Sequence, residues 1–360
     1  MSKDIQQTIY ETYMGMGPKQ VPHWEHWSNP DAETYLTGID YYEHPRLCRI
    51  KLNALYPQLR LGIPESDEPK KRYTEDETDN HTVRWGDGQT ATFQHGEQFF
   101  KSEEDVYSFS PLRHADMRAW PFVVENWDFT SEEAIERRFM DRWPKPWVMP
   151  DAPSTVGAGF YNTTFMWPML SFGWEMFMAC CLDERFERVM EEFAEINRRV
   201  FSVFARLPIR FVTCHDDIVT TRGPVCSPEW MRKYVFPRYE EYWGMLKAAG
   251  KEVIFMVDGC VDQYADDVMA CGARGIISEP YTNYKAIAKR HKDCFLAGEG
   301  DNRVLMRNNP DEIRAMVASM AQTAQMSGGY MMCVGNHIPW NVPGEAIKRY
   351  LDYSQELVSR

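Results

Sequence analysis

The chain has 360 residues, of which 44% are hydrophobic and 26% charged, with a formal net charge of −13 at pH 7. This composition is typical of a globular protein with a sizeable core, and the negative charge argues against a nucleic-acid partner because phosphates would be repelled. No apolar run reaches the roughly 18–20 residues of a membrane span, and the opening segment lacks the apolar core of a signal peptide. Nine cysteines without a C-x-x-C pair favour free thiols, so we expect a cytoplasmic protein with no membrane association.

Residues 1–150 are loop-rich and aromatic, and are predicted to form an N-terminal extension together with the first elements of the fold. The polar stretch 65–81 predicts an exposed excursion. Residues 82–93 have strand-forming residues on both sides of Gly86-Asp87-Gly88, which predicts a hairpin. The prolines of 143–150 exclude a helix and indicate a connection. The aromatic content fits a large core, or in part the wall of a pocket for a flat, apolar substrate.

Capping signals and apolar periodicity predict the helices of the second half. Residues 183–206 form one apolar stripe with charges opposite. Ser227-Pro228-Glu229 is typical of a helix start, and this helix is predicted to run to about Gly250. Asn309-Pro310-Asp311-Glu312 begins another helix, with Glu312 placed for a capping box. A last helix is predicted after Pro343.

Five apolar runs between these helices read as buried strands, and each is followed by polar side chains. The runs and the groups that follow them are 208–213 with His215, Asp216 and Asp217; 253–257 with Asp258; 275–277 with Glu279; 294–297 with Glu299; and 330–334 with Asn336 and His337. Strand–helix alternation predicts a parallel sheet. If the sheet closes into a (β/α)8 barrel, all five polar ends meet at its C-terminal mouth, where such enzymes keep their active sites.

Ordered motifs over residues 180–355 resemble the uroporphyrinogen decarboxylase superfamily. They include His215-Asp216-Asp217-Ile218, Val257-Asp258-Gly259-Cys260, Glu279-Pro280 and Asn336-His337-Ile338. The resemblance implies an α/β fold, a single (β/α)8 TIM barrel domain over 1–360 that includes the N-terminal extension. The superfamily contains porphyrin decarboxylases and also corrinoid-dependent methyltransferases that serve methanol, methylamine, chloromethane and aryl methyl ether metabolism.

Two departures from the family patterns separate these branches. Decarboxylases have an arginine-rich N-terminal segment that clamps the carboxylates of their substrate, whereas the corresponding residues 22–30 contain no arginine and carry Glu25. Zinc-dependent methyltransferases use a His-x-Cys pair and a further cysteine, where this chain has Met256, Asp258 and Asn336. The loss of these thiolates argues against a thiol as methyl acceptor.

The resemblance therefore implies a methyltransferase that moves a methyl group from a small methoxylated, aromatic donor to the cob(I)alamin of a corrinoid protein. An ether oxygen leaves more readily when it receives a proton or a Lewis acid. Clustered carboxylates raise one another's pKa, so Asp258, Glu279 or Glu299 could supply that proton, as could a histidine. A uroporphyrinogen-type decarboxylase and a non-catalytic barrel that binds a corrinoid or porphyrin remain the alternatives.

The residues expected to carry this chemistry fall into three sets. The catalytic set is His215, Asp217, Asp258, Glu279, Glu299 and His337, the substrate-binding set is His23, Trp24, Tyr161, Asn162, Trp167 and Asn336, and the ligands of a divalent ion such as zinc, if one binds, are Asp258, Glu299 and His337. Residues 160–167 could instead be only the first barrel strand and its helix. The mouth loops, with Arg303 and Trp340, are expected to dock the corrinoid protein.

Overall fold

A six-stranded parallel sheet is the centre of the fold. The computed structural model describes residues 21–27, 29–57, 59, 61–72, 82–84, 90–92, 99–119, 127–142, 157–160 and 164–358. The strands of the sheet, in the order in which they lie side by side, are β3 (Gly157–Phe160), β4 (Phe211–His215), β7 (Glu252–Met256), β8 (Gly275–Ile277), β9 (Phe295–Ala297) and β10 (Gly329–Met331). Two antiparallel pairs lie outside it: β1 (Thr82–Arg84) with β2 (Thr90–Thr92), and β5 (Val219–Thr220) with β6 (Gly223–Pro224).

Helices precede, connect and follow these strands. Those before β4 are α2 (Pro30–Thr37), α3 (Pro45–Leu55), α4 (Glu103–Ser108), η3 (Leu112–His114), η4 (Met117–Ala119), α5 (Glu132–Arg142), α6 (Met166–Phe172), α7 (Trp174–Cys180) and α8 (Arg185–Arg206). Those after it are α9 (Pro228–Tyr234), α10 (Phe236–Ala248), α11 (Ala265–Ala270), α12 (Tyr284–Arg290), α13 (Asn302–Arg307), α14 (Pro310–Met326) and α15 (Gly344–Val358).

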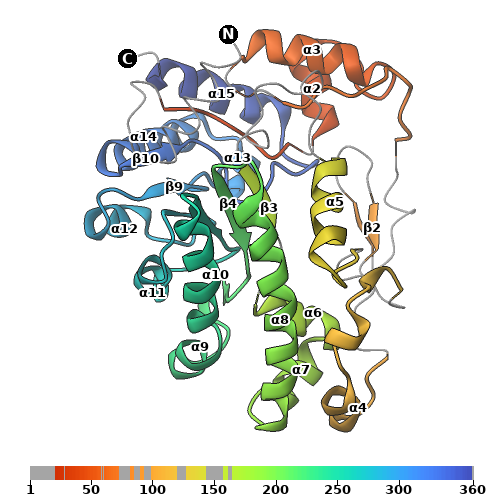
Figure 1. The fold of residues 1–360 in the computed structure, drawn as a ribbon. Coiled ribbons are helices and arrows are strands. Elements are labelled where there is room, and N and C mark those ends of the chain that lie inside the picture. Colours follow the sequence, from red (N-terminus) through yellow and green to blue (C-terminus); the bar gives the residue numbers. More distant parts are fainter. Residues whose placement is uncertain are drawn as a thin grey trace.

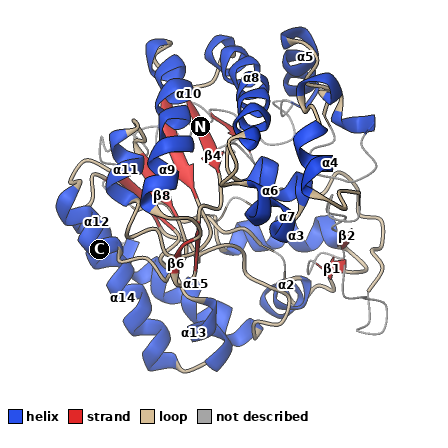
Figure 2. Cartoon of the chain, turned by 90° about the horizontal axis from the view of Figure 1, so that it is seen from below, coloured by secondary structure: helices blue, strands red, loops and turns tan. Residues whose placement is uncertain are grey.

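The order of strands and helices is that of a TIM barrel. Each strand of the sheet pairs in parallel with the next strand along the chain, and at least one helix connects the two. Helices α10, α11, α12 and α14 follow one another around the outside of the strands (Figures 1 and 2). At the β10 edge, a parallel bridge between His23 and Met332 adds the N-terminal segment 21–27 to the series. The predicted α/β barrel fold is confirmed.

Alternation along the strands separates an inner from an outer core, because successive strand residues face opposite sides. The inner face of the sheet carries a compact apolar cluster, against which Trp24 and Ile277 pack. Its members are Phe211, Ile254, Phe295, Ala297, Met331 and Cys333. The intervening residues, such as Val212, Phe255 and Leu296, belong to the large core between the sheet and the helices. The same alternation decides which residues after each strand can face the mouth.

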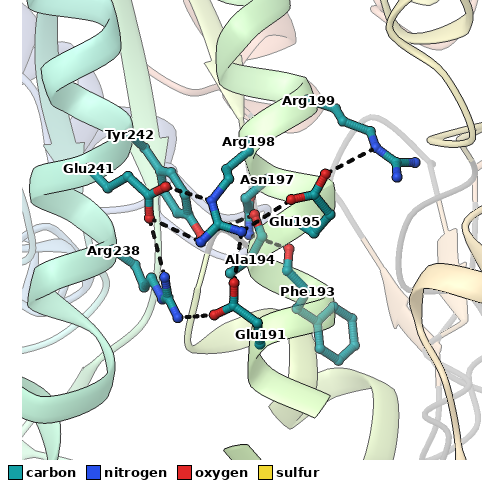
Figure 3. A network of polar contacts seen from close by, with 10 residues as sticks. All are labelled: Glu191, Phe193, Ala194, Glu195, Asn197, Arg198, Arg199, Arg238, Glu241 and Tyr242. Atoms are coloured by element: carbon teal, nitrogen blue, oxygen red, sulfur yellow. Dashed lines mark hydrogen bonds and ion pairs between the residues drawn. The ribbon is translucent and has the colours of Figure 1, made fainter. Parts of the chain in front are cut away.

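Helices α8 and α10 pack together on the outside of the sheet, and a polar network joins them (Figure 3). Arg198 of α8 pairs with Glu241 of α10 at 2.5 Å, and Arg238 of α10 pairs with Glu191 of α8. Below these ion pairs, the rings of Phe201 and Tyr242 stack at 5.0 Å. Partly exposed ion pairs each contribute about 1 kcal/mol or less, so the apolar contact supplies most of the stabilisation.

Most predicted elements are present, with two corrections. The predicted helix 183–206 is α8, and the hairpin over 82–93 is present as β1 and β2. The helix expected from Ser227 to Gly250 is broken at Val235 because Pro237, in the first turn of α10, has no N–H for a continuous helix. Asn309 caps α14 as expected, but Glu312 binds Arg307 instead of completing a capping box.

Two further expectations concern irregular segments and membrane spans. The connection 143–150 lies outside the described residues, as does most of the excursion 65–81. Within the described part of the chain, no helix combines the length and the apolar character needed to cross a membrane.

Candidate active site

The carboxyl ends of β4 and β7 bring a histidine and two carboxylates together. His215 Nε2 lies 2.9 Å from Asp217 Oδ1, and the backbone N–H of Asp258 donates to that same oxygen at 2.7 Å. One nitrogen or oxygen atom from each of these three residues lies within 4.8 Å of the others. The sheet register explains the meeting, since His215 pairs with Met256, two residues before Asp258.

The ends of β8 and β10 add three more predicted residues to this group. Asn336 donates from Nδ2 to Asp258 Oδ2 at 3.1 Å, and its amide lies close enough to the Glu279 carboxyl to lower the pKa of that group. His337 Nδ1 lies 2.7 Å from Asn336 Oδ1. The mouth therefore contains a connected network of His215, Asp217, Asp258, Glu279, Asn336 and His337.

Burial and mutual repulsion change the acidities in this network. Burial and the charges of Asp217 and Glu279 together raise the pKa of Asp258 to about 6, and the charge of His215 opposes them. Burial and the charge of Asp217 also raise the pKa of Glu279, whereas the nearby Asn336 amide has the opposite effect. Burial disfavours charged His215, but the hydrogen bond and charge of Asp217 outweigh it and raise its pKa. Protons are thus retained here at a higher pH than on free carboxyl groups.

Asp216 faces the opposite side of the sheet from His215 and Asp217, and its role is structural. Its fully buried carboxylate accepts the backbone N–H groups of Thr164, Phe165 and Met166 at 2.6–2.8 Å. It also accepts the Tyr239 hydroxyl of α10 at 2.7 Å. These bonds hold the start of α6 against the sheet.

Glu299 is not brought into the network. Its carboxylate accepts hydrogen bonds from Ser319 and Thr323 of α14 and from the Tyr330 hydroxyl, at 2.9–3.3 Å. Tyr330 belongs to the outer core, so Glu299 lies on the outer side of the sheet. The cause is Gly298, whose φ of +98° interrupts the alternation after the inward-facing Ala297.

The expected metal-ligand set is therefore different from the group that the structure assembles. Among the described residues, the carboxylate and imidazole atoms close enough to share an ion belong to His215, Asp217 and Asp258. Asp258 is common to both sets, whereas Glu299 and His337 are not in this group. Oxygen and imidazole donors suit zinc and harder divalent ions.

The predicted substrate-binding residues lie in different places. Trp24 packs on the inner apolar cluster, and its ring stacks on the His26 ring with the centroids 6.2 Å apart. The His26 ring also contacts the His337 ring, at 5.5 Å. His23 faces outward, where it binds Glu25 at 2.7 Å. Trp167 is fully buried in the helical core, where its ring contacts those of Phe129 and Phe193.

Three half-buried residues that were not predicted complete the picture of the mouth. Thr213, Met256 and Ile277 lie on the inner side of their strands, directly before the polar ends. Strand alternation was the available signal for them, because each lies two residues before a network residue on its strand. Tyr161 and Asn162 lie outside the described residues.

The chain belongs to the uroporphyrinogen decarboxylase (URO-D) family, whose sequence profile matches residues 163–357, more than half of the chain. No curated protein matches it. Solved structures that are similar include the IOLI protein with a bound zinc atom, with a TM-score of 0.33 and 10% identity over 57% of this chain and 76% of that one. A xylose isomerase-like TIM barrel protein from Mycobacterium smegmatis in complex with magnesium has a TM-score of 0.30 and 8% identity, over 63% and 89%. Similarity at this level carries no argument about function or metal.

Proposed function

We propose that this chain is a methyltransferase that takes the methyl group of a small methoxylated aromatic compound and delivers it to the corrinoid of a partner protein. The observation that carries the proposal is the connected group of Asp217, Asp258 and Glu279 above an apolar surface of Trp24, Met256 and Ile277. An aromatic ring fits the apolar surface, and the carboxyl network holds a proton beside it.

Asp258 is the group best placed to act on the leaving oxygen. When the C–O bond breaks, its electron pair stays with the oxygen, and a proton from the Asp258 carboxyl neutralises the resulting phenoxide. The docked corrinoid protein supplies the cob(I)alamin nucleophile that receives the methyl group. Glu279 and Asp217 keep the proton on the carboxyl network through repulsion and burial. A protonated acid of this kind is a common source of about 10²–10⁴-fold acceleration.

The charge of the mouth favours this proposal over decarboxylation of a polyacidic porphyrin. Among the described residues, no ion pair joins Asp217, Asp258 or Glu279 to a lysine or arginine. Arg303 lies near enough to Glu279 to lower its pKa, but its guanidinium is held by Asp301 at 2.8–3.1 Å. Substrate carboxylates would therefore meet mainly like charges, which is unfavourable in a half-buried site.

A divalent ion at His215, Asp217 and Asp258 is the alternative source of assistance, since these residues could hold one. A bound ion would polarise the leaving oxygen as a Lewis acid. Elemental analysis of protein purified without chelators decides between the two. Stoichiometric metal that is lost in Asp217→Ala but kept in Glu299→Gln would assign the assistance to this ion.

The experiment that tests the function is methyl transfer to reduced cobalamin. Purified protein is mixed with free cob(I)alamin and with aryl methyl ethers, methanol or methylamine, and methylcobalamin is measured by absorbance. We expect transfer from an aryl ether, at least about 100-fold slower in Asp258→Asn and unchanged in the exposed control Asp293→Asn. Absence of transfer from every donor, together with decarboxylation of uroporphyrinogen or tight cobalamin binding without turnover, would replace the proposal by one of the alternatives.

A further inference from the structure

One amide side chain connects the two halves of the mouth. We propose that Asn336 is a positioning residue whose NH2 group binds Asp258, beside Glu279, while its carbonyl oxygen holds His337 as the Nδ1–H tautomer. The role in catalysis rests on the proposed function, whereas the tautomer of His337 is a property of the free protein. Asn336 itself does not react with the substrate. It holds in place the groups that do.

The backbone of Asn336 is in a conformation that few side chains tolerate. Its φ is +64°, in the left-handed region where glycine and asparagine are favoured. Among the described residues, Asn308 is the other non-glycine residue with a positive φ, at +52°, and it ends helix α13. Helix ends commonly use this conformation, but Asn336 follows a strand end at the mouth. Such strain near a site indicates that the placement of its side chain matters.

Close packing around the preceding residue, Gly335, holds the turn after β10 in place. A Cβ on Gly335 would lie 2.6 Å from Pro280 Cδ and 2.9 Å from the Cα of Glu279. The Gly335 N–H also donates to the Gly300 carbonyl at 2.8 Å. The β10 turn is therefore packed directly against the turn that carries Glu279, which brings the Asn336 amide within reach of both carboxyl groups.

The orientation of the amide follows from its partners. The Asp258 oxygen that faces Asn336 accepts a hydrogen bond when the carboxyl is ionised and also when its proton is on the other oxygen, so Asn336 presents its NH2 group to Asp258. The carbonyl oxygen is then directed at His337 Nδ1, 2.7 Å away, and this nitrogen must carry a hydrogen. In neutral His337 the lone pair is consequently on Nε2. The network thus holds the Asp258 carboxyl and the His337 imidazole in one fixed arrangement.

Two substitutions separate the contacts of Asn336. Asn336→Gly keeps the left-handed backbone at no steric cost and removes all the amide hydrogen bonds. Asn336→Asp keeps an acceptor for His337 but places a third carboxylate beside Asp258 and Glu279. Asn308→Gly is the matched control, because it removes an asparagine with a positive φ from a helix end outside the network.

The tautomer is measured by long-range ¹H–¹⁵N NMR on protein labelled at histidine, at a pH where the imidazoles are neutral, with His337→Gln identifying the resonance. We expect Nδ1–H for His337 in wild type, Asn336→Asp and Asn308→Gly, and a shift toward Nε2–H in Asn336→Gly. An Nε2–H tautomer in wild type, or no change in Asn336→Gly, would overturn the proposal.

Kinetics test the catalytic part separately. Both Asn336 variants are expected to lower kcat for methyl transfer at least about tenfold with a smaller change in KM, while Asn308→Gly leaves both unchanged. A shifted tautomer with unchanged kcat would show that the positioning has no catalytic consequence. If wild type transfers no methyl group, the proposed function fails, and the NMR result still decides whether Asn336 sets the tautomer.

Discussion

Asp258 is expected to lower the stability of the protein at neutral pH. Its folded pKa of about 6 lies above the ordinary value of 3.8, so the folded state holds an extra proton between these pH values. The free energy of unfolding therefore falls as pH rises from about 4 to about 6, by at most roughly 3 kcal/mol, and the loss persists above that range. Burial of the Asp258 carboxyl is the main cause of this shift, the charges of Asp217 and Glu279 add to it, and His215 acts against them.

Asp258→Asn removes this cost and should stabilise the protein by about 1–3 kcal/mol at pH 8 and by much less at pH 4.5. Urea unfolding at the two pH values gives the comparison. Asp293→Asn, at an exposed position, serves as the control and should change the free energy of unfolding little at either pH. A gain for Asp258→Asn that is the same at both pH values would show that the carboxyl group does not titrate as described.

Adjacent residues Asp216 and Asp217 should respond differently to the same change. Asp216→Asn presents an NH2 group to buried N–H donors of Thr164, Phe165 and Met166 and should cost about 3 kcal/mol or more. Asp217→Asn keeps an acceptor for His215 and should cost about 1 kcal/mol or less, yet it should slow methyl transfer. Thermal unfolding and kinetics on both variants check this; equal losses of stability would contradict it.

At the scale of elements, period-two alternation made much of the site predictable. Inward-facing His215, Asp217, Asp258 and Glu279 follow from short apolar runs and a parallel sheet. Glu299 did not follow the rule, because a left-handed glycine before it reverses the direction of its side chain, and a sequence does not show which glycines adopt that conformation.

The orientation of the N-terminal side chains is harder to predict, for a related reason. His23 and Trp24 are neighbours on a segment with no apolar run, so alternation does not indicate which one faces inward. The contact that decides it is the bridge to Met332, more than 300 residues away. Trp167 looked like a pocket residue because its neighbours are aromatic, and burial in the helical core fits the same composition.

Gly298 is the element-level position where substitution should be most damaging. A Cβ there would lie 1.8 Å from the Ser278 carbonyl oxygen, and φ is +98°. Gly298→Ala should therefore cost more than about 3 kcal/mol or prevent folding. Gly244→Ala is the control, since this helical glycine of α10 has open space around it and should gain about 0.5–1 kcal/mol. Chemical denaturation measures both, and a mild effect at Gly298 would refute the described turn.

At the scale of the whole molecule, the proposed function requires a mouth that another protein can reach. Arg303, in the first turn of α13, and Trp340, in the loop before α15, are both exposed, and the Arg303 guanidinium lies 4.4 Å over the ring of exposed Tyr281. Exposed arginine and aromatic side chains of this kind commonly anchor interfaces. We therefore expect the corrinoid protein to dock here.

Arg303→Ala and Trp340→Ala should raise KM for a corrinoid protein about tenfold or more while transfer to free cob(I)alamin is unchanged. Leu182→Ala, which truncates an 80% exposed side chain between α7 and α8, should affect neither acceptor. Equal loss with both acceptors would place Arg303 and Trp340 in substrate binding rather than docking.

The junction of the N-terminal segment with the C-terminal part of the chain also determines when the mouth can form during synthesis. Glu25 accepts the backbone N–H of Val334 and the hydroxyl of Tyr350, across 309 and 325 residues. A ribosome adding about 5–20 residues per second needs roughly 15–65 s between these points. During that time the wall that carries Trp24 has no strand to join. The nascent chain must therefore carry Glu25 without its two distant partners, and Trp24 without the strand that it joins, until the C-terminal part of the chain emerges, and the mouth is among the last parts of the protein to assemble.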